Sequence, residues 1–249
     1  MNKSILILTF LVVLYSLLPS SPTATEIIKK ADERMQGKSS KGSMTMKIIR
    51  PGWERVIKMK TWSLGQDYSL VLITAPPRDK GAAFLKRENE IWNWQPRIDR
   101  VIKLPPSMMM QSWMGSDFTN DDLVKQSSIV TDYEHRLIKD STINGIKSYK
   151  IELIPNEDAA VVWGKIEIFI SKENYNQLLT RFYDEDQHLI NTMIFSDVKM
   201  MGARKIPTKL EVIPTEEPEN RTIIEYQDMS FDIELKDSFF SIQNLKRIK

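Results

Sequence analysis

A chain of 249 residues is long enough for one large β domain or for two ordinary domains. Its 41% hydrophobic and 27% charged residues are typical of a folded soluble protein and argue against a disordered one. The near balance of 35 basic and 33 acidic residues argues against nucleic-acid binding through bulk charge, and the absence of cysteine excludes disulfides, thiolate catalysis and zinc–thiolate sites.

Residues 1–24 differ in composition from the rest of the chain. Lys3 precedes an apolar run at 5–18, and a small-residue segment at 19–24 follows it. This order predicts a secretory signal peptide that is cleaved near Ala24. The apolar run is shorter than the ~20 residues of a membrane-spanning helix, and an uncleaved anchor is the alternative. Without cysteine for lipid attachment or disulfides, the exported product is expected in a bacterial periplasm.

Two segments are expected to be helical. Residues 25–36 have apolar side chains at helical spacing, with Thr25 as a candidate N-cap. The apolar face of this segment contains Ile27, Ile28, Ala31 and Met35. Residues 119–126 form the second candidate, in which Thr119 precedes two aspartates in the manner of an N-terminal cap.

From Gly37 onward the apolar pattern has a period of two, which is typical of β-strands. Turn sequences such as Pro51-Gly52 and Asn144-Gly145 separate the candidate strands. The expected strands are 44–48, 53–62, 68–74, 82–86, 90–95, 133–138, 149–154, 165–170, 178–183, 189–195, 208–213 and 222–226. About a dozen short strands joined by tight turns predict an antiparallel meander that closes toward a barrel. No change in composition marks a second domain, so residues 25–249 are expected to form one domain.

The strand pattern also predicts a hollow. Ile166, Ile168 and Ile170 share one side of their strand, opposite Lys165 and Glu167. A large curved sheet with an apolar face must cover that face, and only two helices and one apolar segment are available to do so. We therefore expect a cavity under a thin cover.

The apolar segment at residues 108–118 has the sequence MMMQSWMGSDF. Methionine adapts to apolar partners of variable shape, and Gly115 interrupts the run. Two interpretations remain open, namely a movable cover over the cavity and a loop packed permanently in the core. Its large apolar residues are Met108, Met109, Met110, Trp113, Met114 and Phe118.

Two tryptophans and three polar residues have two interpretations each. Trp92 and Trp94 share one face of a strand, either as core residues or as an aromatic wall beside acyl chains. Ser116, Asp117 and Thr119 are expected to form local hydrogen bonds and a helix cap rather than to perform chemistry.

Catalytic and metal-binding patterns are missing from the sequence. His135 and His188 are the only histidines, and both are expected at the surface. The chain has no nucleophile elbow, zinc-protease motif or phosphate loop, and the acidic run 184–186 lacks the glycine and spacing of a calcium loop. We therefore expect no enzyme, no metal and no cofactor.

Two adjoining blocks of sequence resemble a known family. Residues 90–106 read EIWNWQPRIDRVIKLPP, and residues 111–125 read QSWMGSDFTNDDLVK. The second block is the more specific one, and residues 75–85 and 240–245 agree with the same pattern. With these features the sequence resembles the outer-membrane lipoprotein-sorting (LolA-like) family of periplasmic carriers over essentially all of its mature length.

The resemblance implies an unclosed antiparallel β-barrel, a half-barrel whose apolar cavity is closed by a lid of helices and loops. It also implies a monomeric periplasmic carrier of an acylated lipoprotein or lipid, with transient membrane contact and an inner-membrane exporter as a partner. No nucleic acid is expected to bind. The residues expected at the cavity or its lid are Ile27, Ile28, Met35, Trp92, Trp94, Met108, Met109, Met110, Trp113, Met114 and Phe118.

Other classes of protein remain as alternatives. The chain could be a non-catalytic adaptor, or a structural exported β protein, that partners an exporter. A transmembrane barrel would need strands of ~9–11 residues, and several expected strands are shorter. In the carrier interpretation, cargo binding displaces residues 108–114 and the first helix.

Overall fold

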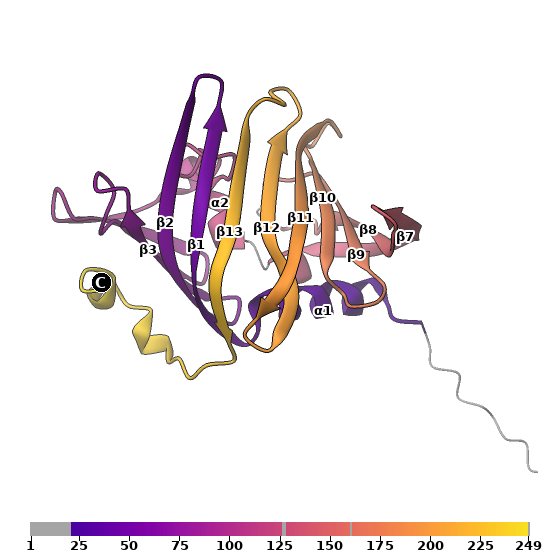
Figure 1. The fold of residues 1–249 in the computed structure, drawn as a ribbon, viewed down its shortest axis with the longest axis horizontal. Coiled ribbons are helices and arrows are strands. Elements are labelled where there is room, and N and C mark those ends of the chain that lie inside the picture. Colours follow the sequence, from indigo (N-terminus) through magenta and orange to yellow (C-terminus); the bar gives the residue numbers. More distant parts are fainter. Residues whose placement is uncertain (1–20, 126–127, 160, 249) are drawn as a thin grey trace, which may run out of the picture.

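The computed structural model describes residues 21–125, 128–159 and 161–248. The expected signal peptide lies outside the described residues, apart from 21–24. The described chain forms one sheet of 13 strands (Figure 1). The strands are β1 (Ser39–Arg50), β2 (Trp53–Leu64), β3 (Tyr68–Ala75), β4 (Ala83–Arg87), β5 (Glu90–Gln95), β6 (Arg100–Lys103), β7 (Tyr133–Ile143), β8 (Ile146–Pro155), β9 (Lys165–Ser171), β10 (Gln177–Tyr183), β11 (Leu189–Met201), β12 (Arg204–Pro214) and β13 (Arg221–Phe231).

The sheet is an antiparallel meander that does not close. Its order is β6-β5-β4-β3-β2-β1-β13-β12-β11-β10-β9-β8-β7, so the first and last strands pair near its centre. Strands β6 and β7 remain at opposite edges, which confirms the expected half-barrel. The expected strands are all present, and β6 is an addition that the period-two pattern missed. This strand has four residues, and three of them are exposed, so it carries little apolar alternation.

Helix α1 (Ala24–Gln36) lies near one end of β10 to β12 (Figure 1). Its N-cap is Thr23 and not Thr25 as expected. The Thr23 hydroxyl accepts the N–H of Glu26 at 3.3 Å, and the Glu26 carboxylate accepts the N–H of Thr23 at 2.8 Å. This reciprocal pair satisfies two N–H groups at the start of the helix and so places that start one residue earlier than expected.

Helix α2 (Asn120–Lys125) confirms the second expected helix, of which residue 126 lies outside the described residues. Thr119 caps it, because its hydroxyl accepts the N–H of Asp122 at 3.1 Å and its own N–H donates to the Asp122 carboxylate at 2.7 Å. Helix α3 (Ile242–Leu245) was not expected from the sequence. The remaining helical turns are η1 (Pro106–Met108), η2 (Ser128–Val130) and η3 (Asp237–Phe239).

The two faces of the sheet are covered differently. On what we call the inner face, Met46, Ile57 and Ile73 continue across the sheet to Leu210 and Val212 and pack with Trp113 and Phe118. The isoleucines of β9 extend this face and pack against α1. On the outer face of β2 to β5, residues 235–248, which we call the C-terminal segment, cover the sheet. The buried residues of that outer cluster are Trp62, Leu70, Leu72, Ala83, Leu85, Trp94, Phe240 and Leu245.

Candidate functional site

A cavity of about 270 Å³ lies between the inner face of the sheet, α1 and the segment that precedes α2. This volume is close to the lower end of the range for small-molecule pockets, roughly 300–1,000 Å³. Alternating residues of at least eight strands supply its walls, since every second side chain of a strand points to the same face. The apolar lining includes Ile28, Met35, Met44, Met59, Val71, Phe84, Trp113, Phe118, Trp163, Ile166, Ile168, Ile170, Phe182, Met193, Phe195, Leu210, Ile224 and Met229.

The cover segment, residues 111–119, closes one side of this cavity with two buried rings. Trp113 is 3% exposed, and its ring stands edge-on to that of Phe84 with 5.5 Å between the centroids. Phe118 is 7% exposed and lines the same cavity. The N–H of Trp113 donates to the carbonyl of Phe118 at 2.7 Å, so a tight loop holds the two rings together.

Ser116 forms the turn of the cover segment, as expected, whereas Asp117 bonds the distant Arg50 and Thr222 instead of making the expected local hydrogen bonds. The Ser116 hydroxyl donates to the carbonyl of Trp113 at 2.7 Å and accepts the N–H of Phe118 at 3.2 Å. Ser112 donates to the carbonyl of Ser116 at 2.5 Å. These bonds satisfy backbone groups of the loop where it is buried, which an irregular segment needs in order to be buried.

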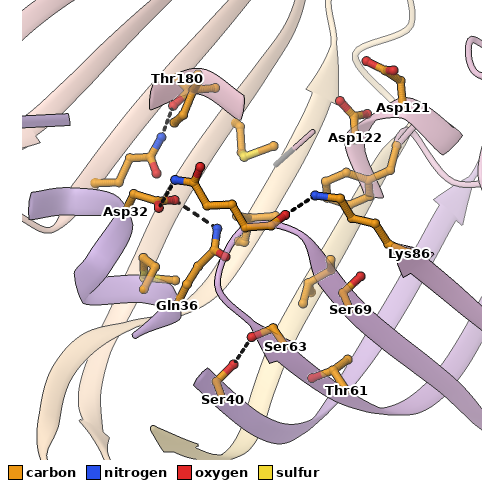
Figure 2. Close-up of a pocket in the computed structure, with 18 of the residues that line it drawn as sticks. Asp32, Gln36, Ser40, Thr61, Ser63, Ser69, Lys86, Asp121, Asp122 and Thr180 are labelled. Carbon is orange, nitrogen blue, oxygen red and sulfur yellow. Dashed lines mark hydrogen bonds between the residues drawn. The ribbon is translucent and has the colours of Figure 1, made fainter. Parts of the chain in front are cut away.

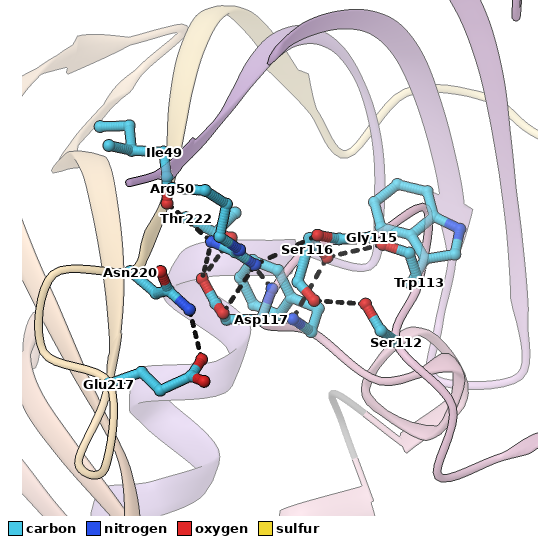
Figure 3. Close-up of polar contacts among 11 residues, drawn as sticks. Ile49, Arg50, Ser112, Trp113, Gly115, Ser116, Asp117, Glu217, Asn220 and Thr222 are labelled. Carbon is cyan, nitrogen blue, oxygen red and sulfur yellow. Dashed lines mark hydrogen bonds and ion pairs between the residues drawn. The ribbon is translucent and has the colours of Figure 1, made fainter. Parts of the chain in front are cut away.

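Two arginines on the β1–β2 hairpin tie the cover segment to the sheet, and Figure 3 shows the first of them, Arg50. Arg50 contacts both carboxylate oxygens of Asp117, at 2.9 and 3.2 Å, and donates to the carbonyl of Gly115 at 3.1 Å. Thr222 of β13 donates to the same carboxylate at 2.7 Å. Arg55 donates to the carbonyl of Met114 at 3.1 Å. Because the Arg50 and Asp117 side chains are only 15% and 8% exposed, this is a largely buried ion pair whose partners depend on each other.

One end of the cavity is polar (Figure 2). Asp32 of α1 accepts hydrogen bonds from the side-chain amides of Gln36 at 2.9 Å and Gln66 at 3.5 Å. The ammonium of Lys86, on β4, donates to the backbone carbonyl of Gln66. Burial raises the pKa of Asp32 to about 6, and burial lowers the pKa of Lys86. We call this region the polar end, and it comprises Asp32, Gln36, Ser40, Thr61, Ser63, Gln66, Ser69 and Lys86.

A second acidic group borders the cavity at the start of α2. Asp121 and Asp122 both line it, and burial raises the pKa of Asp122 although Thr119 caps its carboxylate. Burial also raises the pKa of the Tyr133 phenol, and the nearby aspartates add to this effect. The Asp122 carboxylate is part of the helix cap, so its structural role is already accounted for.

The eleven residues that the sequence predicted for the cavity or lid divide into two groups. Ile28, Met35, Trp113 and Phe118 line the cavity. The other seven do not contribute to its lining, and they are Ile27, Trp92, Trp94, Met108, Met109, Met110 and Met114.

The structure places these seven residues in other surroundings. Ile27 is fully buried in the core between α1 and β8–β9, and Met114 packs against the core of the inner face. Trp92 and Trp94 lie on the outer face with the C-terminal segment, as in the core interpretation of this pair.

The methionine triplet does not line the cavity either. Met108 and Met109 pack against Ile91 and Leu104, and Met110 is 59% exposed. The cover interpretation of this region therefore rests on Trp113 and Phe118 alone, because their side chains are the ones in the segment that reach the cavity wall.

The polar end was missed by sequence reasoning, although signals for it exist. Asp32 follows Ile28 by four residues, so an acidic side chain lies on the apolar face of the helix. Lys86 follows Phe84 by two residues in a strand, which places both on one face. A charged residue on an otherwise apolar face is the sequence pattern that indicates this polar end.

In the described part of the chain, no cluster of three or more histidine, aspartate or glutamate side chains is arranged to hold a metal ion. None of the helices within residues 21–125, 128–159 and 161–248 has the length and apolarity needed to cross a membrane. His135 links Thr25 at 3.0 Å to the carbonyl of Ile129 at 2.6 Å, and His188 is exposed beside Asp184.

Comparisons with known proteins agree with the fold. A family model described as "Uncharacterized protein" matches residues 65–247, and a search of curated proteins found no match. A DUF1329 family protein from Desulfovibrio piger is 22% identical with a TM-score of 0.81, over 89% of this chain and 97% of that one.

Two further solved structures are similar to this chain over most of its length. A domain from Vibrio parahaemolyticus, described as an outer membrane lipoprotein-sorting protein, is 22% identical with a TM-score of 0.79, over 90% of this chain and 98% of that one. A LolA superfamily protein from Nitrosomonas europaea is 22% identical with a TM-score of 0.78, over 90% and 100% of the two chains. The chain therefore belongs to the family whose model matches residues 65–247, and its fold is similar to those of the lipoprotein-sorting domain and the LolA superfamily protein.

Proposed function

We propose that this protein is a non-catalytic periplasmic carrier that holds the acyl chains of a lipoprotein or lipid in its cavity and moves them toward the outer membrane. An inner-membrane exporter is its expected loading partner. The observation that carries the proposal is the covered cavity, whose walls are mainly methionine, isoleucine and aromatic side chains from at least eight strands.

The energetics of transfer favour a cavity of this kind. Each buried methylene is worth ~0.8 kcal/mol, so one long acyl chain represents on the order of 12 kcal/mol relative to water. A carrier must offset most of this free energy in order to take cargo from a membrane, yet must still release the cargo. Flexible methionines such as Met44, Met59 and Met193 can adapt to chains of different shape.

Entry of a long chain requires the cover segment to move. Trp113 and Phe118 close the wall from a loop whose turn is held together by its own hydrogen bonds, so the loop can swing as one unit. The contacts that must then open are those from Arg50, Arg55 and Thr222. We propose that cargo displaces residues 111–119 and shifts α1, which forms the adjoining wall.

Fluorescence quenching by a fatty acid with a brominated chain tests this proposal, because bromine quenches only those tryptophans that it approaches closely. We expect saturable quenching of the native protein. Trp113→Phe should remove a large part of that quenching, since Trp113 lines the cavity. Trp94→Phe is the matched control on the outer face, where Trp94 is 8% exposed, and it should leave the quenching nearly unchanged.

Two results would count against the carrier. Absence of saturable quenching would show that acyl chains do not enter, and would favour the exporter adaptor with an unused cavity. Equal losses in the two variants would show that the probe binds to the surface rather than next to Trp113.

A further inference from the structure

The polar end of the cavity has two charged side chains that no direct ion pair joins. Among the described residues, Asp32 accepts hydrogen bonds only from the neutral amides of Gln36 and Gln66. Lys86 donates to the carbonyl of Gln66. Both side chains line the same cavity, from α1 on one side and β4 on the other (Figure 2).

Such an arrangement is costly in a cavity that holds nothing polar. Removing a carboxylate or an ammonium from water is unfavourable unless charges or hydrogen bonds compensate for it. The neutral partners of Asp32 compensate only in part, because burial still raises its pKa to about 6. Three hydrogens are available on an ammonium, and the described contacts of Lys86 use one of them. Polar groups of a ligand would offset the remaining cost.

Neutral hydrogen-bonding groups surround the two charges. Ser40 and Ser63 are joined by a hydrogen bond at 2.7 Å, and Thr61 and Ser69 add hydroxyls from β2 and β3. The indole Nε1 of Trp113 is buried without a hydrogen-bond partner in the described part of the chain, and this residue also lines the cavity. The wall therefore offers donors and acceptors to a ligand in addition to apolar contacts.

The sign of the two charges decides which heads fit. An anionic head drawn to Lys86 also comes close to the Asp32 carboxylate, which repels it. A cationic head drawn to Asp32 comes close to Lys86, the one cation among the described lining residues. A head without net charge avoids both repulsions, because it can donate to the carboxylate and accept from the ammonium.

We propose that the polar end is a head-group site, and that this site selects amphiphiles whose head carries no net charge and presents both donors and acceptors. The inference rests on the proposed carrier function and specifies its cargo. The acyl tail of the bound amphiphile would lie along the isoleucines of β9 and the methionines of β1, β2 and β11. Hydroxylated heads and zwitterionic heads share this chemistry, and the experiment separates them.

Calorimetric titration with four single-chain lipids of equal chain length tests the inference. The probes are a monoacylglycerol, a lysophosphatidylethanolamine, a lysophosphatidylglycerol and an alkyltrimethylammonium salt, each below its critical micelle concentration. We expect the two probes without net charge to bind at least about tenfold more tightly than the anionic and the cationic probe. The order of the first two shows whether hydroxyls or a zwitterion suit the site better.

Two substitutions should change this selectivity in opposite directions. Asp32→Asn leaves Lys86 without a nearby acid on α1, so the anionic probe should gain about tenfold relative to the monoacylglycerol. Lys86→Met keeps the apolar stem and removes the positive charge, so the cationic probe should gain by a similar factor. Glu33→Gln and Lys58→Met are matched controls, because both residues are exposed and lie outside the cavity, and they should leave the order of probes unchanged.

The outcomes separate the two proposals. If no probe binds the native protein, the carrier function itself fails. If all four probes bind equally well and neither variant alters their order, acyl chains enter but the head-group site does not exist. A shift of the same size in Glu33→Gln as in Asp32→Asn would assign the effect to overall charge and would also overturn the head-group site.

Discussion

The two faces of strands β2 to β5 are formed by alternate residues of the same strands, yet they have different properties. On the outer face, Phe240 is fully buried and packs against Tyr68 and Phe239, with centroid distances of 5.7 and 5.2 Å. On the inner face, Val71 and Phe84 border a cavity of about 270 Å³. The outer face is a solid core covered by the end of the chain, and the inner face is covered at a distance by a loop and a helix.

Within one sheet, the outer face contributes mainly to stability and the inner face is available for binding. A densely packed face fixes the curvature of the strands, because its side chains have few alternative arrangements. The opposite face can then remain hollow without collapse. Aromatic residues are plentiful on both faces, so aromatic content alone does not distinguish a wall from a core. The elements that cover each face decide whether that face is a cavity wall or a packed core.

The largest expected effect comes from truncating the solid face. Phe240→Ala should destabilise the protein by ~3–5 kcal/mol, since it removes a fully buried ring. Phe195→Ala on the cavity wall should cost only ~1–2 kcal/mol, because that ring already borders open space. Urea unfolding of the two variants measures the difference. Equal losses would mean that the inner face is packed as tightly as the outer one.

The next effect concerns the attachment of the cover segment. Arg50→Met should destabilise the protein by about 3 kcal/mol, because it leaves the Asp117 carboxylate buried without its cation. Hydrogen exchange of amides in residues 111–119 should accelerate as well. Lys103→Met is the control, since the Lys103–Glu90 pair is about half exposed and should contribute less than ~1 kcal/mol. If exchange stays unchanged in Arg50→Met, the arginine does not hold the cover.

A third effect has the opposite sign. Folding raises the pKa of Asp32 from 3.8 to about 6, so between these pH values the folded protein keeps a proton that the unfolded chain releases. The contribution of Asp32 to stability is thus fully present below pH 3.8 and is lost as the pH rises to about 6. Asp32→Asn should therefore stabilise the protein at pH 7 by about 1–3 kcal/mol.

Urea unfolding of the native protein and Asp32→Asn at pH 4 and pH 7 measures this effect. The advantage of the variant should be present at pH 7 and should shrink at pH 4. An advantage that does not depend on pH would show that the Asp32 carboxyl has an ordinary pKa in the folded protein.

The smallest effect is expected at the methionine triplet. Met110→Ser should alter stability by less than ~0.5 kcal/mol and should leave acyl-chain binding unchanged, because this side chain is 59% exposed and does not line the cavity. Calorimetry with the monoacylglycerol checks the second part. A marked loss of affinity would show that the triplet takes part in the bound state.

The sequence was sufficient for the architecture and only partly so for the site. Period-two patterns identified the expected strands, and of the apolar helix face Ile28 and Met35 border the cavity whereas Ile27 does not. Trp92 and Trp94 show the limit, because alternation says that two residues share a face but not which face is hollow. That depends on where the chain after β13 goes, and its short helix α3 has too few residues for a periodic signal.

The cover segment shows a second limit. The composition of the segment predicted that the three methionines line the cavity, whereas Trp113 and Phe118 do so. The direction in which a loop presents its side chains depends on its turn, here fixed by Ser116 and by the bonds from Arg50 and Arg55. Such long-range bonds leave no local pattern in a single sequence.

Native mass spectrometry of the protein released gently from its own cells tests the central claim most directly. We predict a discrete mass increment that corresponds to an amphiphile with at least one acyl chain and a head of no net charge, and we predict its loss on extraction with organic solvent. Folded protein from the native host that shows only the mass of the polypeptide, with no bound amphiphile, would contradict the account.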